Sequence, residues 1–253
     1  MSIIKLSFKD RTLLFAKLSS IAYSNTKKAT SQAKKLGFTT TEFYDKDGAQ
    51  AFRFMNKTDI VIACRGTQPN EFNDIRADLR AVPVMAETVG KVHLGFKQEV
   101  DDLWPMVCED INRKVNLKKH LWFCGHSLGA AMATIMSSRC LHNEELNDPV
   151  ELHTYGSPRV GWRKYVNSLG VTHHRWVNNN DIVTGVPLWI MGYVHHGEKH
   201  YINAYGNVRN PSGWQLFKDR LRGMWMGIKK KRIDNFSDHS ITDYIKHIDG
   251  WKS

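Results

Sequence analysis

The sequence predicts an α/β fold in which a mostly parallel central sheet has helices on both faces. Strand-like and helix-like segments alternate along most of the chain, as they do in parallel sheets with crossover helices. An apolar run over 121–124 leads into a serine bracketed by glycines and then into small residues at helical spacing, which indicates strand, sharp turn and helix. With 253 residues and no Pro/Ser-rich linker, the chain is expected to form one domain, 1–253.

The first part of the chain predicts two helices and then neighbouring strands. Leucines and alanines at helical spacing predict an amphipathic helix over 12–24, and a short helix is expected over 31–36. Strands are predicted over 38–43, 51–55 and 59–64, with a hairpin turn at Lys46, Asp47 and Gly48.

The rest of the chain continues the alternation of helices and strands. The segment 92–96 is expected to lead into a long helix through 115. Further helices are expected after Ser127, before 169, over 213–228 and over 240–248. Strands are expected over 150–155, 173–177 and 193–204.

Composition narrows the class of protein. The four cysteines, Cys64, Cys108, Cys124 and Cys140, lack C-x-x-C spacing, so neither disulfides nor a zinc knuckle are expected. The N-terminus has no uninterrupted apolar signal region and no run of about 18 apolar residues occurs, so a soluble, cytoplasmic protein is expected.

The net charge of +11 is unevenly distributed. Residues 208–232 contain eight Lys or Arg and one acidic residue, a net charge of +7. Within them, Trp214, Phe217, Leu221, Met224, Trp225 and Ile228 recur every three or four residues. Two interpretations stay open for 214–232: a helix on an anionic membrane surface, or an ordinary helix packed on the domain. Nucleic acid is not an expected partner because no aromatic platform accompanies the charge.

Ser127 is the candidate nucleophile. In Gly125-His126-Ser127-Leu128-Gly129 the turn is so tight that only glycine fits two residues before and two after the serine. The N–H of Leu128, unpaired at a helix N-terminus, points toward the same space and is a candidate oxyanion donor. The alternative is a plain strand-to-helix connection.

A serine hydroxyl needs a base and an oriented acid. Asp181, just past a predicted strand, is the candidate acid, and His239, at the start of the last helix, is the candidate base. The order Ser, Asp, His is the one that α/β-hydrolase sheets present. Asp181 could instead be a cap or turn residue, with Asp234 and Asp238 as its competitors.

The strongest rivals of His239 are His195, His196 and His200. A metal site in this cluster is not expected, because His196 and His200 would share one strand face with few further ligands.

Seven motifs in order resemble the class 3, or fungal-type, lipases. They are R-G-T at 65–67, V-H-L-G-F at 92–96, G-H-S-L-G-A-A at 125–131, Y-G-S-P-R-V-G at 155–161, V-N-N-N-D-I-V-T-G-V-P at 177–187, Y-V-H-H-G-E at 193–198 and D-H-S-I-T-D-Y at 238–244. The resemblance implies an α/β-hydrolase fold, the triad Ser127, Asp181 and His239, and Thr67 as the second oxyanion donor beside Leu128.

The resemblance also implies a lid near 68–81, where Phe72, Ile75 and Leu79 could form an apolar face. The implied activity is a serine carboxylester hydrolase that acts on acylglycerols or related lipid esters through an acyl-enzyme, without metal or organic cofactor. Two alternatives stay open: an acyl hydrolase for phospholipids or galactolipids, and a non-catalytic membrane-binding module. The sequence does not predict an oligomeric state.

Overall fold

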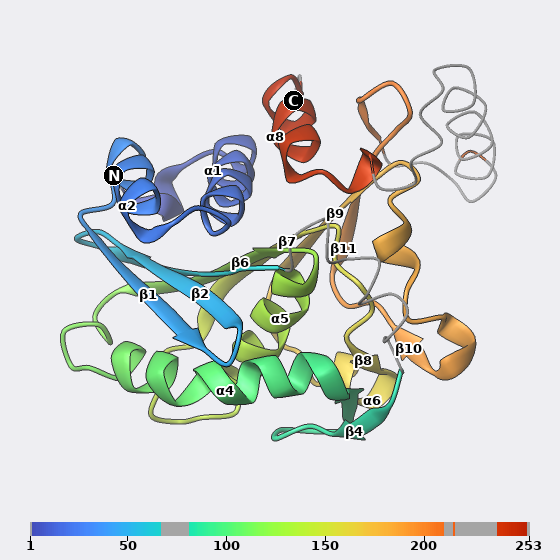
Figure 1. Cartoon of the computed structure of the whole chain (residues 1–253), viewed down its shortest axis with the longest axis horizontal. Helices are drawn as coiled ribbons and strands as arrows, with labels where there is room; N and C mark the ends of the chain where they lie inside the picture. Colours follow the sequence, from blue (N-terminus) through green and yellow to red (C-terminus); the bar gives the residue numbers. More distant parts are fainter. Residues whose placement is uncertain (1, 67–80, 210–214, 216–236, 252–253) are drawn as a thin grey trace.

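The computed structural model describes residues 2–66, 81–209, 215 and 237–251. Its centre is an eight-stranded sheet in the order β1-β2-β3-β6-β7-β9-β11-β12 (Figure 1). The strands are β1 Thr40–Lys46, β2 Ala49–Met55, β3 Asp59–Cys64, β6 His120–His126, β7 Pro149–Tyr155, β9 His173–Asn178, β11 Glu198–Ile202 and β12 Val208–Arg209. The five from β3 to β11 run parallel, which confirms the predicted α/β class.

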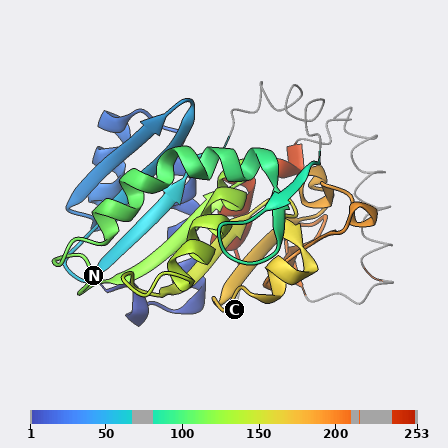
Figure 2. The same ribbon diagram turned by 90° about the horizontal axis from the view of Figure 1, so that it is seen from below.

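Helices cover both faces of this sheet, as Figures 1 and 2 show. One face is covered by α1 Phe8–Ile21, α2 Thr26–Lys35 and α8 Ile241–Asp249, and the other by α4 Leu94–Ile111, α5 Leu128–Leu141 and α6 Arg163–Asn167. A separate hydrophobic cluster fills each side. Because both clusters pack on the same strands, the sheet is buried on both faces.

Shorter elements surround the end of the sheet where β6, β7 and β9 finish. A small sheet has the order β10-β8-β5-β4, formed by Tyr193–Val194, Gly161–Trp162, Lys91–His93 and Pro83–Met85. The 3₁₀ helices η2 Ile182–Gly185, η3 Trp189–Met191 and η4 Ser237–His239 belong to this region, whereas η1 Ile3–Lys5 lies at the other end of the sheet, where Ile3 N donates to Asp59 at the start of β3.

Most predicted elements are present, and their bounds differ for local reasons. The turn at 46–48 is confirmed, because Asp47 and Gly48 both have positive φ, 52° and 93°. The first two helices begin earlier than predicted, since the side chains of Ser7 and Asn25 cap them. The helix expected to reach 115 ends at Ile111.

One element is wrong. The single strand predicted over 193–204 is two short strands, β10 and β11, which belong to different sheets. Gly197, with a φ of 84°, lies between them, in a left-handed conformation that ends a strand. A side chain there would also overlap His173.

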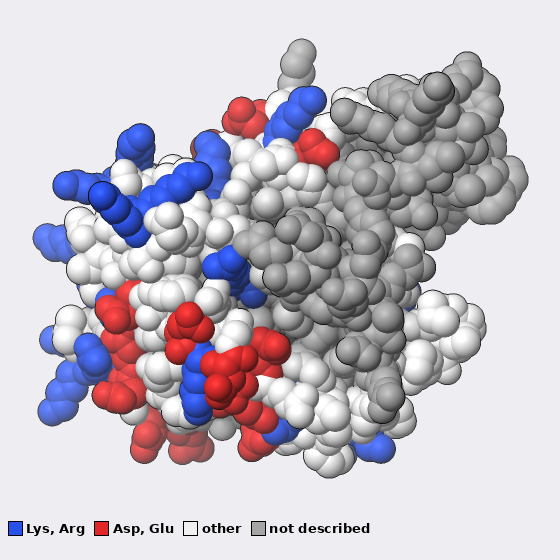
Figure 3. Space-filling model, viewed as in Figure 1, with Lys and Arg blue, Asp and Glu red and all other residues white. Residues whose placement is uncertain are grey.

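On the face that Figure 3 shows, most acidic side chains and most basic side chains gather in different areas. Figure 3 shows acidic side chains gathered over α4 and Lys and Arg side chains over α2. Among the described residues, no helix combines the length and apolarity that a bilayer crossing requires.

Candidate active site

Ser127 lies at the apex of the turn between β6 and α5, with φ 59° and ψ −128°. This backbone conformation is costly for a residue with a side chain and persists only where the surroundings enforce it. A Cβ on Gly125 would overlap the carbonyl of Gly129, and a Cβ on Gly129 would overlap the carbonyl of Cys64. The predicted strained turn, with glycine required on both sides, is therefore confirmed.

The side chain of Ser127 is buried, yet no described residue holds its hydroxyl by a hydrogen bond. Ser127 is 1% exposed, and its Oγ has no hydrogen-bond partner among the described residues. Leu128 is the first residue of α5, so its N–H has no acceptor within the helix. The turn thus places a hydroxyl beside a helix N-terminus, where negative charge is stabilised.

Asp181 and His239 are brought together across 58 residues of sequence. The Nδ1 of His239 lies 2.9 Å from both carboxylate oxygens of Asp181. A carboxylate only accepts, so Nδ1 carries the proton and Nε2 has the lone pair that a base requires. Asp181 also caps η2, because its Oδ1 accepts from Val183 N at 3.0 Å. The interpretation of Asp181 as a cap is confirmed, and its contact with His239 is compatible with the predicted role as the acid.

Gly156, at the end of β7, makes room for this pair. It has a φ of +59°, and a Cβ there would lie 2.7 Å from Asp181 Oδ2 and 2.8 Å from His239 Nδ1. Both distances are too short for nonbonded atoms. The glycine in the Y-G-S-P motif is therefore required by the imidazole and the carboxylate.

Tyr244 is a further site residue to which the sequence analysis gave no role. Its hydroxyl donates to Asp181 Oδ2 at 2.6 Å and accepts from the backbone N–H of Asn178 at 2.9 Å. Burial, followed by the nearby Asp181 charge, raises the pKa of Tyr244 well above its usual range. The tyrosine therefore stays a donor and fixes the carboxylate. Its place five residues after His239, on α8, was the signal available.

His126 and Tyr23 join the serine turn to the base, and the sequence analysis assigned neither of them. His126 Nε2 lies 2.7 Å from the carbonyl oxygen of His239, and its Nδ1 lies 2.9 Å from the hydroxyl of Tyr23. Since a carbonyl only accepts, Nε2 donates and Nδ1 accepts from Tyr23. The rings of His126 and His239 are 4.5 Å apart. Burial lowers the pKa of His126 well below its usual range, so it is neutral.

The rivals of the proposed acid and base are engaged elsewhere. The carboxylate of Asp238 accepts from Asn180 N at 3.3 Å and from Asn179 at 3.4 Å. His195 donates to the carbonyl of Thr184, His196 pairs with His173, and His200 pairs with His174. The three histidines therefore do not form one cluster, and the expectation that His196 and His200 share a strand face is wrong.

Several predicted residues lie outside the described part of the chain. These are the oxyanion candidate Thr67, the lid candidates Phe72, Ile75 and Leu79, the acid competitor Asp234, and the basic segment 214–232 except Gln215.

Comparison with known proteins identifies the family. The model of the class 3 lipases matches residues 61–191, slightly more than half of the 253 residues. The chain belongs to the class 3 lipase family. The match includes Ser127 and Asp181 and ends before His239.

Two curated relatives illustrate the similarity. Toxin TseL of Vibrio cholerae is 37% identical over 49% of this chain and 19% of its own length. The lipase of Rhizomucor miehei is 32% identical over 69% of this chain and 50% of its own length. The chain thus spans half or less of the length of these relatives.

The fold is shared with solved lipases. The Rhizomucor miehei triacylglyceride lipase superposes with a TM-score of 0.66 and 24% identity, over 76% of this chain and 79% of that chain. This likeness agrees with the α/β-hydrolase architecture of the described residues.

Proposed function

We propose that this class 3 lipase is a serine carboxylester hydrolase that acts on acylglycerols or related lipid esters. The hydrogen bond between His239 and Asp181, beside the strained serine turn, carries the proposal. His239 Nε2 takes the proton of Ser127 Oγ as that oxygen attacks the ester carbonyl, forming a C–O bond. The tetrahedral intermediate collapses when the bond to the leaving alcohol breaks, and His239 returns the proton to that alcohol.

Water then attacks the acyl-enzyme through the same base, releasing the fatty acid and restoring Ser127. Asp181 holds the imidazole tautomer and stabilises the imidazolium that forms. The N–H groups of Leu128 and Thr67 are the proposed oxyanion donors, and each such donor contributes about 3 kcal/mol in measured enzymes. No metal or organic cofactor takes part in these steps.

The experiment is hydrolysis of p-nitrophenyl esters by Ser127→Ala. Loss of the nucleophile should lower kcat by about 10⁴-fold or more. The free energy of unfolding should change little, because the hydroxyl bonds no described group. Turnover within tenfold of the native chain, from a folded variant, would reject the assignment of Ser127.

We also propose lipid esters as the substrate class, supported by the relatives. The Rhizomucor miehei relative is a lipase, and its solved structure is that of a triacylglyceride lipase. Purified protein should hydrolyse an emulsified diacylglycerol faster than a phosphatidylcholine or a galactolipid of equal acyl composition. A preference for either of the other two lipids would favour the alternative acyl hydrolase, and no turnover of any ester would favour the non-catalytic module.

We further propose that the protein meets an anionic membrane surface. The segment 214–232 was the first candidate for this contact, and among the described residues 188–191 offer a second. Apolar side chains there face solvent, with exposed fractions of 51% for Leu188, 70% for Trp189 and 68% for Ile190. Surface-exposed apolar side chains gathered in this way are typical of interaction sites.

Basic residues adjoin this apolar tip. A groove of about 550 Å³ is lined by Trp189 together with Lys91, Arg163 and Lys164. Basic side chains near apolar ones favour a surface of anionic lipid.

Flotation with liposomes tests this contact. The double variant Trp189→Ser, Ile190→Ser should bind phosphatidylserine-containing liposomes less well than the native chain, whereas Ile4→Ser, an exposed isoleucine elsewhere, should bind equally. Native binding that is indifferent to phosphatidylserine would reject an anionic surface. Equal binding by all three proteins would reject residues 188–191 as the contact.

Cytoplasmic residence is likewise a proposal. All four cysteines are free, and Cys64, Cys124 and Cys140 are buried. Unpaired thiols suit a reducing compartment. Fractionation of native cells with an antibody to the protein tests it, and recovery outside the cytoplasmic fraction would overturn it.

A further inference from the structure

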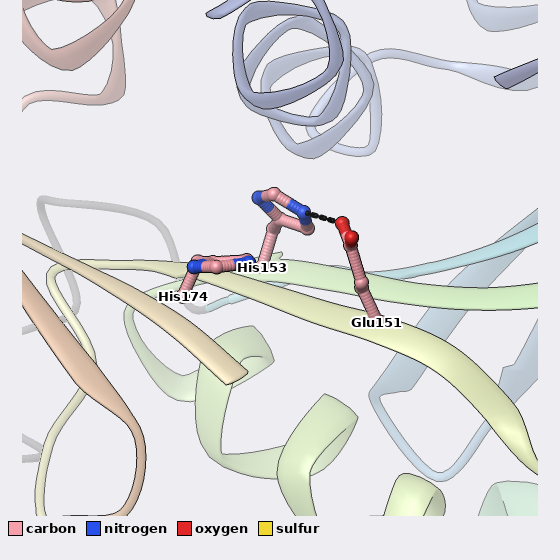
Figure 4. Close-up of side chains that lie close together, drawn as sticks. All are labelled: Glu151, His153 and His174. Atoms are coloured by element: carbon pink, nitrogen blue, oxygen red, sulfur yellow. Dashed lines mark hydrogen bonds and ion pairs between the residues drawn. The ribbon is translucent and has the colours of Figure 1, made fainter. Parts of the chain in front are cut away.

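Histidine and carboxylate side chains also gather at the opposite, N-terminal ends of the parallel strands. Two groups lie there: Glu151, His153 and His174 (Figure 4), and His174, Glu198 and His200. Neither belongs to the proposed triad. Their different hydrogen bonding decides which one suits a metal ion.

The group in Figure 4 is already saturated. Glu151 Oε2 accepts from His153 Nε2 and from Arg11 Nε, both at 2.8 Å. The other ring nitrogen of His153 lies 3.0 Å from the hydroxyl of Thr12. A cation would have to displace the Arg11 guanidinium and break both bonds of a fully buried imidazole, so this group is structural.

The second group has donor atoms in a different arrangement. β9 and β11 are parallel neighbours, with Glu198 opposite His174, and His200 lies two residues further along β11 on the same face as Glu198. His174 Nδ1 lies 3.1 Å from His200 Nε2, and Glu198 Oε2 lies 3.7 Å from each of these nitrogens. The two nitrogens share a hydrogen bond, which a metal ion would replace, and the three possible ligand atoms from two strands lie within 3.7 Å of one another.

These separations match the ligand spacing of zinc. The circle through three points with these sides has a radius of about 2.0 Å, and Zn–N and Zn–O bonds are about 2.0–2.2 Å. A Zn²⁺ ion near the centre of the triangle would thus reach all three donor atoms without movement of the strands. Two imidazoles and one carboxylate are also a ligand set typical of zinc.

The surroundings hold the ligands and leave one side open. Phe8 and Trp176 pack on the His200 ring, with centroids 5.2 and 4.8 Å away. The side chains of His174 and His200 are 12% and 13% exposed, and that of Glu198 is 64% exposed.

We propose that His174, His200 and Glu198 form a site for a divalent transition metal, with Zn²⁺ as the best fit and water as the fourth ligand. Bound metal ties β9 to β11 and so stabilises the edge of the sheet. This proposal is independent of the proposed hydrolase function, because the site lies at the opposite end of β9 from Asp181.

Thermal unfolding of tag-free, chelator-treated protein with added Zn²⁺ tests the site. A ligand that binds only the folded state at a hundredfold excess over its Kd should raise Tm by roughly 5–10 °C in a chain of this size. Calorimetric titration should give one ion per chain. Co²⁺ should give the intense visible absorption of a four-coordinate site. Absence of a Zn²⁺-dependent change in Tm would overturn the proposal.

Substitutions test whether the Zn²⁺-dependent rise in Tm depends on these residues. His200→Gln should abolish the Zn²⁺-dependent rise in Tm, and Glu198→Gln should weaken Zn²⁺ binding at least tenfold. His196→Gln is the matched control, since His196 contacts His173 at 3.0 Å in a similar histidine pair. A rise that survives His200→Gln, or that is lost in His196→Gln, would overturn the assignment.

Discussion

Two hydroxyl–imidazole–carboxylate sets lie at opposite ends of the same sheet. One is Ser127, His239 and Asp181 at the C-terminal ends of the strands. The other is Thr12, His153 and Glu151, with separations of 3.0 Å from hydroxyl to imidazole and 2.8 Å from imidazole to carboxylate. In both, the carboxylate fixes the imidazole proton on one ring nitrogen. Residue types and the imidazole–carboxylate distance, 2.8 Å in one set and 2.9 Å in the other, therefore do not distinguish them.

The sets differ in what surrounds the hydroxyl and the carboxylate. Thr12 lies within α1 and is 0% exposed, and its hydroxyl is held by His153. Arg11 neutralises Glu151. Ser127, by contrast, immediately precedes α5 at a positive φ, and its hydroxyl has no partner in the described chain. A fully bonded set stabilises the fold, whereas a reactive set leaves its nucleophile uncommitted beside oxyanion donors.

The largest expected effect is the difference in kcat between replacing Asp181 and replacing Glu151. Asp181→Asn would place the imidazole in the wrong tautomer and remove the charge that stabilises the imidazolium, so kcat for a soluble ester should fall about 10⁴-fold. Glu151→Gln is the control, because it also neutralises a carboxylate on a buried histidine. It should lower the free energy of unfolding and leave kcat within a few-fold. Equal losses of kcat in the two folded variants would contradict the assignment of Asp181 as catalytic and Glu151 as structural.

The second-largest effect concerns the space that Gly156 leaves for Asp181 and His239. Gly156→Ala should push Asp181 and His239 apart, since the new Cβ would lie 2.7–2.8 Å from both side chains. A misplaced base should lower kcat by about 100-fold, with a smaller change in KM. Gly170→Ala, where a Cβ meets no atom within 4 Å, should be neutral. Full activity in Gly156→Ala would contradict the packing described for the pair.

A smaller effect should come from Tyr244, a positioning residue. Tyr244→Phe removes the donor to Asp181 Oδ2 and so changes the electrostatic environment of the His239–Asp181 pair, which should shift the acidic limb of the kcat/KM profile and lower kcat roughly tenfold. Tyr44→Phe is the matched variant, since Tyr44 donates to buried Asp110 far from the serine. It should destabilise the fold without moving the pH profile. Identical pH profiles for Tyr244→Phe and the native chain would reject the assignment of Tyr244 as a positioning residue.

The last effect is on stability rather than on catalysis and concerns a third buried imidazole. His93 stacks on Phe96, and neither of its ring nitrogens has a described partner. Burial lowers the pKa of His93 to about 4 from its ordinary 6.5. Between these values the unfolded chain binds the additional proton, so stability is full above pH 6.5 and falls as the pH drops toward 4, by at most about 3 kcal/mol.

Urea unfolding across this pH range checks the contribution of His93. The free energy of unfolding of each protein above pH 7 is its reference. Relative to that reference, His93→Phe should lose less stability between pH 6.5 and 4 than the native chain does. Parallel stability curves for the two proteins would show that His93 is not buried neutral.

Sequence reasoning located the serine turn because glycine spacing and an apolar strand are local signals. Motif order then placed Asp181 and His239, which the fold brings within 2.9 Å of each other. The supporting contacts could not be predicted in this way. Tyr244 reaches Asp181, and His126 reaches the backbone of His239, only through the packing of distant elements. Gly197 similarly divides a stretch whose side-chain pattern resembled one strand. Assignment to one domain stays a prediction.

The most direct test of the central claim is covalent labelling with a fluorophosphonate, followed by peptide mass mapping. The account predicts one adduct, on Ser127, that is lost in Ser127→Ala and strongly slowed in His239→Ala, with Thr12 unlabelled. An adduct on another residue of the native chain, or undiminished labelling in Ser127→Ala, would contradict it.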